Sequence, residues 1–221
     1  MVKATFTLEN ATVSNNAYLY GVTSTNKLMK HIAVFCGSSD GYNDSYREQA
    51  YQAGIALAEK GIHIIYGAAR IGIMGAIADG VLNGGGKVTG VIPHFLQTKE
   101  IVHDGLTELI VVNTMHERKL KMYELCQGVL ILPGGWGTME ELFEMLTWGQ
   151  LGMHEKPIGI LNINGYYDAL NAFNSTMVQE GFLDECTRSI LMYSDSLEEL
   201  LAKMETYTAP ELPKLINKQT T

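Results

Sequence analysis

Three glycines and two carboxylates stand together in the stretch PGGWGTMEE (133–141), and their types and spacing could do chemistry. A glycine loop that leads into a helix offers unpaired backbone N–H groups and the positive end of the helix dipole, which together bind phosphate. A carboxylate beside a phosphate is electrostatically unfavourable unless it has a chemical role or a cationic partner. The stretch therefore predicts a phosphate loop and raises the question of what the two glutamates beside it do.

A cationic partner is offered by the segment MHERK (115–119), which follows the apolar run ELIVV. Arg118 can bind phosphate or carboxylate through two parallel hydrogen bonds, and Lys119 can add a point charge. If both segments lie at the same edge of a sheet, they form a local basic pocket for one small phosphorylated ligand.

Purely structural interpretations account for the same residues. Thr138 and Glu141 have the spacing of a capping box, in which Thr138 caps a helix and Glu141 reaches back to its backbone. Glu140 suits a solvated first turn, where the helix dipole favours an acid. The MHERK segment likewise suits an exposed, charged helix start. Spacing alone leaves the structural and the chemical interpretations open.

Two further glycine-containing stretches, CGSS (36–39) and GAARIGIMG (67–75), also follow apolar runs and precede expected helices. In an open parallel sheet the carboxyl ends of the strands form one ligand-binding edge, so three such loops favour a nucleotide-like ligand. No glycine loop supplies the Gly-Lys-Ser/Thr of a Walker motif, and the G-x-G-x-x-G spacing is absent at the first strand. Phosphoryl transfer and hydride transfer are therefore disfavoured.

Short apolar runs alternate with amphipathic segments from Lys30 onward, which is typical of a parallel sheet covered on both faces. The pattern predicts a doubly wound α/β sheet of six or seven strands in a single domain. The expected strands lie in HIAVFCGSS, GIHIIYGAA, KVTGVIPHFL, ELIVVNTM, GVLILPGGWGT and KPIGILNI. Residues 1–28 are expected to be an N-terminal extension, 29–207 the nucleotide-binding catalytic domain, and 208–221 a polar C-terminal tail.

The composition narrows the classes of partner and compartment. The 221 residues carry a net charge of −8, which disfavours binding to nucleic acid or to an anionic membrane surface. No apolar run approaches the ~20 residues of a membrane span. The three separated cysteines indicate neither a disulfide framework nor a zinc site, so a cytoplasmic protein without a metal or other cofactor is expected.

At this point the motifs resemble those of the LONELY GUY family, cytokinin riboside 5′-monophosphate phosphoribohydrolases that are often labelled lysine decarboxylases. PGGWGTMEE matches the signature PGGxGTxxE, and VFCGSS, IGIMGAIADG, GGGKVTGVIP, MHERK, TWGQLGMHEKPIGILN and GYYDAL resemble family motifs in the same order. The decarboxylase label has little physical support, because no lysine is singled out for a pyridoxal phosphate Schiff base.

The resemblance implies a Rossmann-like homodimer that hydrolyses the N-glycosidic bond of a nucleoside 5′-monophosphate to a free base and ribose 5-phosphate. It implies Arg118 and Glu141 as the catalytic pair. The substrate contacts that it implies are Glu100, Lys119, Gly134, Gly135, Trp136, Gly137, Thr138, Met139, Glu140 and Thr147.

One departure from the family pattern concerns the substrate, and three alternatives stay open. The chain has Gly67-Ala68-Ala69 where the family commonly has three glycines, so methyl groups could narrow the pocket. The base is undetermined, which leaves AMP and N6-prenylated AMP as candidates. A protein that carries a phosphorylated ligand such as molybdenum cofactor without cleaving it is the main alternative function. A dinucleotide oxidoreductase is a third, disfavoured by the missing fingerprint.

Overall fold

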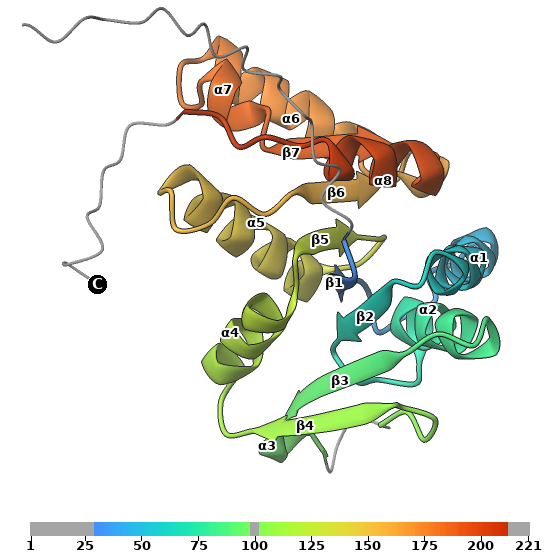
Figure 1. Cartoon of the computed structure of the whole chain (residues 1–221). Coiled ribbons are helices and arrows are strands. Elements are labelled where there is room, and N and C mark those ends of the chain that lie inside the picture. The colour runs from blue at the N-terminus through green and yellow to red at the C-terminus, as the bar shows by residue number, and fades with distance from the viewer. Residues whose placement is uncertain (1–28, 98–101, 212–221) are drawn as a thin grey trace, which may run out of the picture.

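The computed structural model describes residues 29–97 and 102–211, which form a seven-stranded parallel sheet (Figure 1). The strand order is β4-β3-β2-β1-β5-β6-β7, and every neighbouring pair is parallel. The chain therefore winds outward from β1 to one edge and then returns to build the other half from β5. The strands are β1 (His31–Phe35), β2 (His63–Tyr66), β3 (Val88–Pro93), β4 (Glu108–Val112), β5 (Gly128–Ile131), β6 (Ile158–Leu161) and β7 (Leu191–Ser194).

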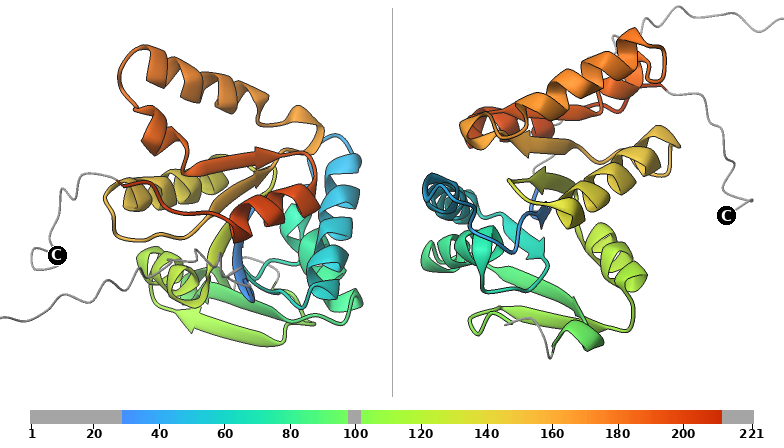
Figure 2. Two further views of the ribbon diagram at one scale, coloured as in Figure 1. Left: turned by 45° about the horizontal axis from the view of Figure 1, so that its top comes forward. Right: turned by 180° about the vertical axis from the view of Figure 1, so that it is seen from behind.

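Helices cover both faces of this sheet (Figure 2). Helices α1, α2 and α8 pack on one face, and α4 and α5 pack on the other. The helices are α1 (Ser45–Glu59), α2 (Gly72–Asn83), α3 (His94–Gln97), α4 (Met115–Leu125), α5 (Trp136–Gln150), α6 (Asp168–Gln179), α7 (Glu185–Arg188) and α8 (Leu197–Glu205), with a 3₁₀ turn η1 (Ile163–Gly165).

Strand β1 illustrates why its residues form a central strand. Side chains alternate across a strand, so Ile32 and Val34 pack in the core beneath α1, α2 and α8, while Ala33 and Phe35 pack beneath α4 and α5. All four are buried. A run that is apolar at every position is what a strand with helices on both faces requires.

The predicted doubly wound α/β sheet is confirmed, with seven strands. The strand β7 was not identified in the sequence because it is only partly buried and lacks a continuous buried apolar run. The helices α3 and α7 were missed because each is a single turn of four residues. The expected N-terminal extension lies outside the described residues, as does the tail beyond 211, so the domain boundaries stay predictions. None of the helices within 29–97 and 102–211 combines the length and apolar character needed to cross a bilayer.

Candidate active site

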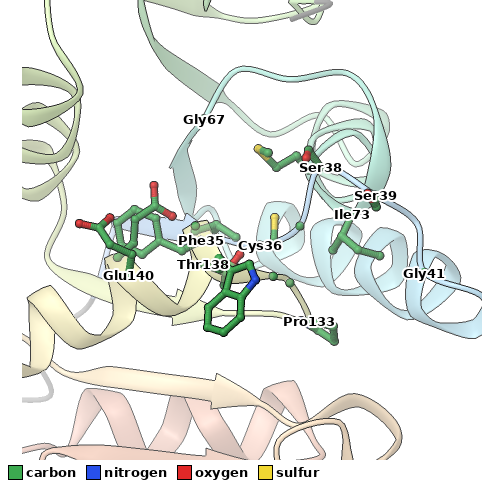
Figure 3. A pocket seen from close by; sticks show the side chains of 18 of the residues that line it. Phe35, Cys36, Ser38, Ser39, Gly41, Gly67, Ile73, Pro133, Thr138 and Glu140 are labelled. Carbon is green, nitrogen blue, oxygen red and sulfur yellow. The ribbon is translucent and has the colours of Figure 1, made fainter.

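A cavity of about 480 Å³ lies at the carboxyl ends of β1 and β5, where the direction of winding reverses. This is the position at which open α/β sheets bind ligands. The loop after β1, from Cys36 to Gly41, forms one side, and the β5–α5 loop with the start of α5 forms another (Figure 3). In that view Thr138 and Glu140 lie toward α5, and Ser38, Ser39 and Ile73 lie on the opposite side.

The β5–α5 loop presents unpaired backbone donors. Helix α5 begins at Trp136, with Gly135 as its N-cap and no side chain capping it. The first backbone bond into the helix runs from the Met139 N–H to the Gly135 carbonyl. Within the described part of the chain, the N–H groups of residues 135–138 therefore have no partner, which is the arrangement that binds an anion.

The capping-box interpretation is therefore wrong. Thr138 is the third residue of α5 and is buried, rather than standing before the helix as its cap. The capping-box interpretation placed the helix start three residues too late, because Gly135 occupies the cap position without a side chain to mark it. Glu141 therefore does not take part in capping the helix, and it lines the cavity.

The carboxyl of Glu141 has a pKa near neutrality. Burial raises the pKa of its carboxyl from 4.5 to about 7. The charge of Arg118 opposes this rise, and the charge of Glu140 adds to it. No ion pair involving Glu141 is found among the described residues, so Arg118 lowers the pKa without direct contact. A carboxyl that titrates near the working pH is suited to general acid–base chemistry.

Arg118 reaches the cavity from the first turn of α4. Thr114 caps this helix by accepting from the Glu117 N–H, and the Glu117 carboxylate accepts from the Asn113 N–H at 2.8 Å. The arrangement differs from a standard capping box, because Glu117 accepts from the residue before the N-cap, and the two bonds together anchor the first turn of α4 that carries Arg118. Arg118 is only 6% exposed, so the expectation of an exposed charged turn is wrong for it.

The Arg118 guanidinium retains an unused donor. Its Nη2 donates to the Gly67 carbonyl at 3.2 Å, and its Nη1 lies 4.0 Å from the Met115 sulfur. The buried Nε has no hydrogen-bond partner among the described residues. Gly67 permits this approach, since a Cβ there would stand 2.0 Å from Nη2. A buried cation with an unpaired donor beside a cavity is a site for an anionic or oxygen-rich ligand.

Lys119 is turned away from this cavity. Its ammonium lies 2.5 Å from Glu140 and 2.9 Å from Glu144, and it is not among the residues that line the cavity. Burial lowers its pKa, but the two carboxylates outweigh this and leave the pKa raised overall. Lys119 is buried, so the exposed-turn interpretation is wrong here too. Glu140 is thus an ion-paired residue at the cavity wall rather than a merely solvated one.

The other residues proposed from the sequence divide into three groups. Residues 134–138 line the cavity, including Trp136, which is 93% exposed. Met139 packs toward the core, and Thr147 lies further along α5, where its hydroxyl donates to the Phe143 carbonyl. Neither lines the cavity of this single chain. Glu100 lies outside the described residues.

The alanines that replace the family's glycines do not narrow this cavity. Ala68 and Ala69 are fully buried, and only Gly67 of that segment reaches the cavity. Ala68 has a φ of +70°, a conformation that favours glycine. The departure therefore affects backbone strain beneath the site rather than the shape of the cavity wall.

Tyr46 and Tyr166 line the cavity and were not singled out in the sequence. The position of GYYDAL immediately after the strand β6 was the available signal, because that segment starts at the ligand-binding edge. Among the described residues no group of three or more His, Cys, Asp or Glu side chains could hold a metal ion. The groups of the cavity lining on which the sequence-based prediction depends are the Glu141 carboxyl, the Arg118 guanidinium and the backbone donors of the β5–α5 loop.

Comparison with known sequences gives long matches. The family model described as "Possible lysine decarboxylase" matches residues 74–204. The Arabidopsis thaliana protein named cytokinin riboside 5′-monophosphate phosphoribohydrolase LOG1 is 43% identical over 190 residues, covering 86% of this chain and 89% of that protein. The Oryza sativa protein named cytokinin riboside 5′-monophosphate phosphoribohydrolase LOG is 42% identical, covering 80% of this chain and 74% of that protein.

Solved structures share the fold at lower identity. The molybdenum cofactor binding protein of Rippkaea orientalis has a TM-score of 0.59 at 20% identity, covering 80% of this chain and 95% of that one. The molybdenum cofactor carrier protein of Chlamydomonas reinhardtii has a TM-score of 0.57 at 18% identity, covering 78% and 98%. At these identities the similarity shows the fold alone.

Proposed function

This chain belongs to the LONELY GUY family of cytokinin riboside 5′-monophosphate phosphoribohydrolases, and from that premise we propose that it hydrolyses the N-glycosidic bond of a nucleoside 5′-monophosphate. The products are a free base and ribose 5-phosphate. The enzyme assignment follows from curated relatives at 42–43% identity over most of both chains. The carrier function has no comparable support, since its representatives share only the fold.

One observation carries the assignment to this cavity. A carboxyl with a pKa of about 7, a buried guanidinium with an unpaired Nε, and a run of unpaired helix N–H groups meet at the switch point of the sheet. Glu141 and Arg118 come from different helices, and each residue is placed by its own local structure. This set matches the three needs of the reaction, namely an anchor for the phosphate, a cation, and a group that serves the reacting carbon.

We assign the phosphate to the N–H groups of residues 135–138. Hydrogen bonds from a helix start suit an anion and hold the ribose by its 5′ end. Binding energy from this remote group then positions the reacting bond. Arg118 orients the ribose or Glu141 through its unpaired Nε.

Glu141 acts at the anomeric carbon. Cleavage of the C1′–N bond leaves its electron pair on the base and builds positive charge on the sugar, as in glycoside hydrolysis. The ionised Glu141 carboxylate stabilises that charge and takes a proton from the attacking water, whose oxygen bonds to C1′. Glu141 then releases this proton and the departing base gains one, so that the hydroxyl group of the water ends on ribose 5-phosphate and a proton ends on the base.

Product analysis tests the proposal. The purified chain is incubated with AMP and with N6-isopentenyl-AMP, and the products are separated by chromatography. Glu141→Gln is expected to lower turnover at least ~10³-fold, the scale of losing one essential charged group at a reacting centre. Glu198→Gln, on the exposed first turn of α8, is the matched control with normal turnover. Full turnover in Glu141→Gln, or intact nucleotide with the native chain, would contradict the proposal.

The identity of the base belongs to the same proposal. We propose that both AMP and N6-prenylated AMP are accepted, because the cavity of about 480 Å³ lies within the ~300–1,000 Å³ of small-molecule sites and has apolar walls at Ile73, Met74 and Met115. The ratio of kcat/KM for the two nucleotides measures the preference. Cleavage of neither nucleotide, with retained cleavage of another, would reject this choice of base.

We also propose a homodimer in the cytoplasm. Leu120 on α4 and Phe143 on α5 are 47% and 40% exposed, and such apolar side chains on neighbouring helices support contact with a second copy. Light scattering at micromolar concentration tests this, and a monomer would contradict it.

The three free, separated cysteines support a reducing compartment. Cell fractionation tests that location, and recovery in an oxidising compartment would contradict it.

A further inference from the structure

Tyr166, which was not among the site residues predicted from the sequence, forms a hydrogen bond with the glycine-containing β5–α5 loop. The Tyr166 hydroxyl donates to the Gly134 carbonyl oxygen at 2.8 Å, across a connection of 32 residues. We propose that Tyr166 is a positioning residue, which orients the backbone of the β5–α5 loop for the substrate's phosphate. The inference rests on the proposed function, because it concerns how that site binds its anion.

The bond controls more than one atom because the peptide group is planar. The Gly134 carbonyl and the Gly135 N–H belong to the same peptide, and no cis peptide is found among the described residues. In a trans peptide these two groups point in opposite directions, so fixing the carbonyl also fixes the N–H. The Gly135 N–H is the first of the unpaired donors at the start of α5.

The loop needs this restraint because its glycines do not restrict the backbone conformation. Gly134 and Gly135 have no side chains, and glycine explores more backbone conformations than any other residue. The two preceding carbonyls each accept a hydrogen bond from another segment of the chain. Leu132 accepts from the Tyr167 hydroxyl at 2.8 Å, and Pro133 accepts from the Gly37 N–H at 3.0 Å. Tyr166 extends this series of restraints to the peptide that carries the N–H of Gly135, the N-cap of α5.

Tyr166 is itself held in place before any ligand binds. Its ring lies edge-on to Tyr46 of α1, with centroids 5.7 Å apart, and edge-on to Tyr167 at 4.8 Å. The same connection is tied to α1 by the Asn164 amide, which lies 2.5 Å from the Ser45 hydroxyl. The hydroxyl of Tyr166 is therefore preorganised, which spares the loop an ordering cost on binding.

Loss of the hydroxyl has a defined consequence. Without it the Gly134 carbonyl has no partner, and its peptide can rotate until the oxygen faces the anion. An oxygen dipole in that position repels a phosphate, while an N–H attracts it. Binding of the phosphate group is therefore expected to weaken, and the chemistry at Glu141 is expected to continue once the substrate is bound.

Tyr166→Phe tests this, because it keeps the ring and removes one oxygen. KM for AMP is expected to rise about tenfold, the scale of one hydrogen bond to a charged group, with kcat changed less than about twofold. The Kd of ribose 5-phosphate, measured by calorimetry, is expected to rise by the same factor. Binding of adenosine, which lacks the phosphate, is expected to stay unchanged.

Tyr193→Phe is the matched control. Tyr193 lies on β7, outside the cavity, and its hydroxyl accepts a hydrogen bond from the Asn174 amide of α6 at 2.9 Å. The substitution removes this hydroxyl. It is expected to lower Tm without changing KM, which separates lost stability from lost positioning.

Two results would overturn the inference. They are an unchanged Kd for ribose 5-phosphate in Tyr166→Phe, and an equal loss of affinity for AMP and adenosine. The second result would make Tyr166 a wall of the cavity only. Absence of turnover in the native chain would instead contradict the proposed function, and ribose 5-phosphate binding would still decide the role of Tyr166.

Discussion

The starts of α2 and α5 look alike in sequence, yet their backbone donors are used in opposite ways. Both follow a glycine-containing loop at the carboxyl edge of the sheet. At α2 the Ile73 N–H donates to the Ser39 carbonyl, and the Met74 N–H donates to the Gly37 carbonyl. At α5 the corresponding N–H groups have no partner within the described residues.

The difference shows that a glycine loop is not by itself an anion site. The N–H groups at the start of α2 donate to carbonyls of the β1–α1 loop and hold the two segments together at one wall of the cavity. These N–H groups are therefore not available to a ligand. Gly72 allows this joint with a φ of +65° and a close approach to Ser38. The free donors of α5 are left for a ligand, which supports the proposed role of α5 as the anion-binding helix of the pair.

The largest expected effect comes from breaking the joint at α2. A Cβ at Gly72 would lie 2.2 Å from the Ser38 carbonyl carbon, in addition to the cost of a positive φ. Gly72→Ala is expected to lower the free energy of unfolding by more than ~3 kcal/mol, measured by urea denaturation. Gly61→Ala also has a positive φ, with open space around it, and should cost only ~1 kcal/mol. Equal losses in the two variants would refute the steric account.

The next effect concerns Glu141, which lies beside the free donors of α5. Its folded-state pKa of about 7 exceeds the ordinary 4.5, so the folded chain holds a proton that the unfolded chain releases between these values. Its contribution to stability is therefore present below pH 4.5 and is lost as the pH rises through 7. Glu141→Gln should be more stable than the native chain by up to about 3 kcal/mol at pH 8, at 1.36 kcal/mol per pKa unit.

Denaturation of both proteins from pH 4 to pH 8 measures this difference, which should vanish near pH 4. Glu198→Gln serves as the control and should show no gain, because Glu198 is exposed on the first turn of α8 and lies outside the cavity lining. A constant difference between Glu141→Gln and the native chain across the pH range would refute the raised pKa.

A smaller effect is expected from adding one methyl group beside the free donors. Gly137 has no heavy atom within 4 Å of a Cβ built on it, and it lies in the first turn of α5. Gly137→Ala should stabilise the chain by ~0.5–1 kcal/mol through helix propensity. The methyl group should also obstruct a phosphate there and raise KM for AMP several-fold. Enzyme kinetics and thermal denaturation together test this, and an unchanged KM would move the phosphate away from α5.

The smallest effect is expected at Ala68, beneath the α2 side. Ala68→Gly relieves the left-handed strain at φ +70° but removes a buried methyl group, and each term is ~1 kcal/mol. Stability should therefore change by less than ~1 kcal/mol, and KM for AMP should not change, because Ala68 does not line the cavity. A changed ratio of kcat/KM between AMP and N6-isopentenyl-AMP would show that this position does influence the base.

Sequence reasoning identified the elements better than their junctions. The strands β1, β2, β3, β5 and β6 were found because each lies in an apolar run, as burial on both faces requires. Strand β4 lies at the sheet edge and is mostly exposed, and its Val/Ile-rich sequence identified it. The start of α5 was misplaced because Gly135 caps it without a side-chain signal. The resemblance implied that Lys119 contacts the substrate, and in the structure Lys119 is paired with Glu140 and Glu144, which lie one helical turn apart on α5. Such a pairing depends on helix packing, which no local pattern encodes.

The sequence by itself determined the doubly wound sheet, because apolar periodicity is a local pattern. It also predicted a candidate site at the carboxyl edge from the glycines that follow the strands, and the family resemblance implied Arg118 and Glu141 as the catalytic pair. Only the tertiary structure decided which helix start keeps its donors free, how burial moves the Glu141 pKa, and that Tyr166 reaches Gly134. Each of these depends on groups far apart in the chain that meet only when β5 returns beside β1.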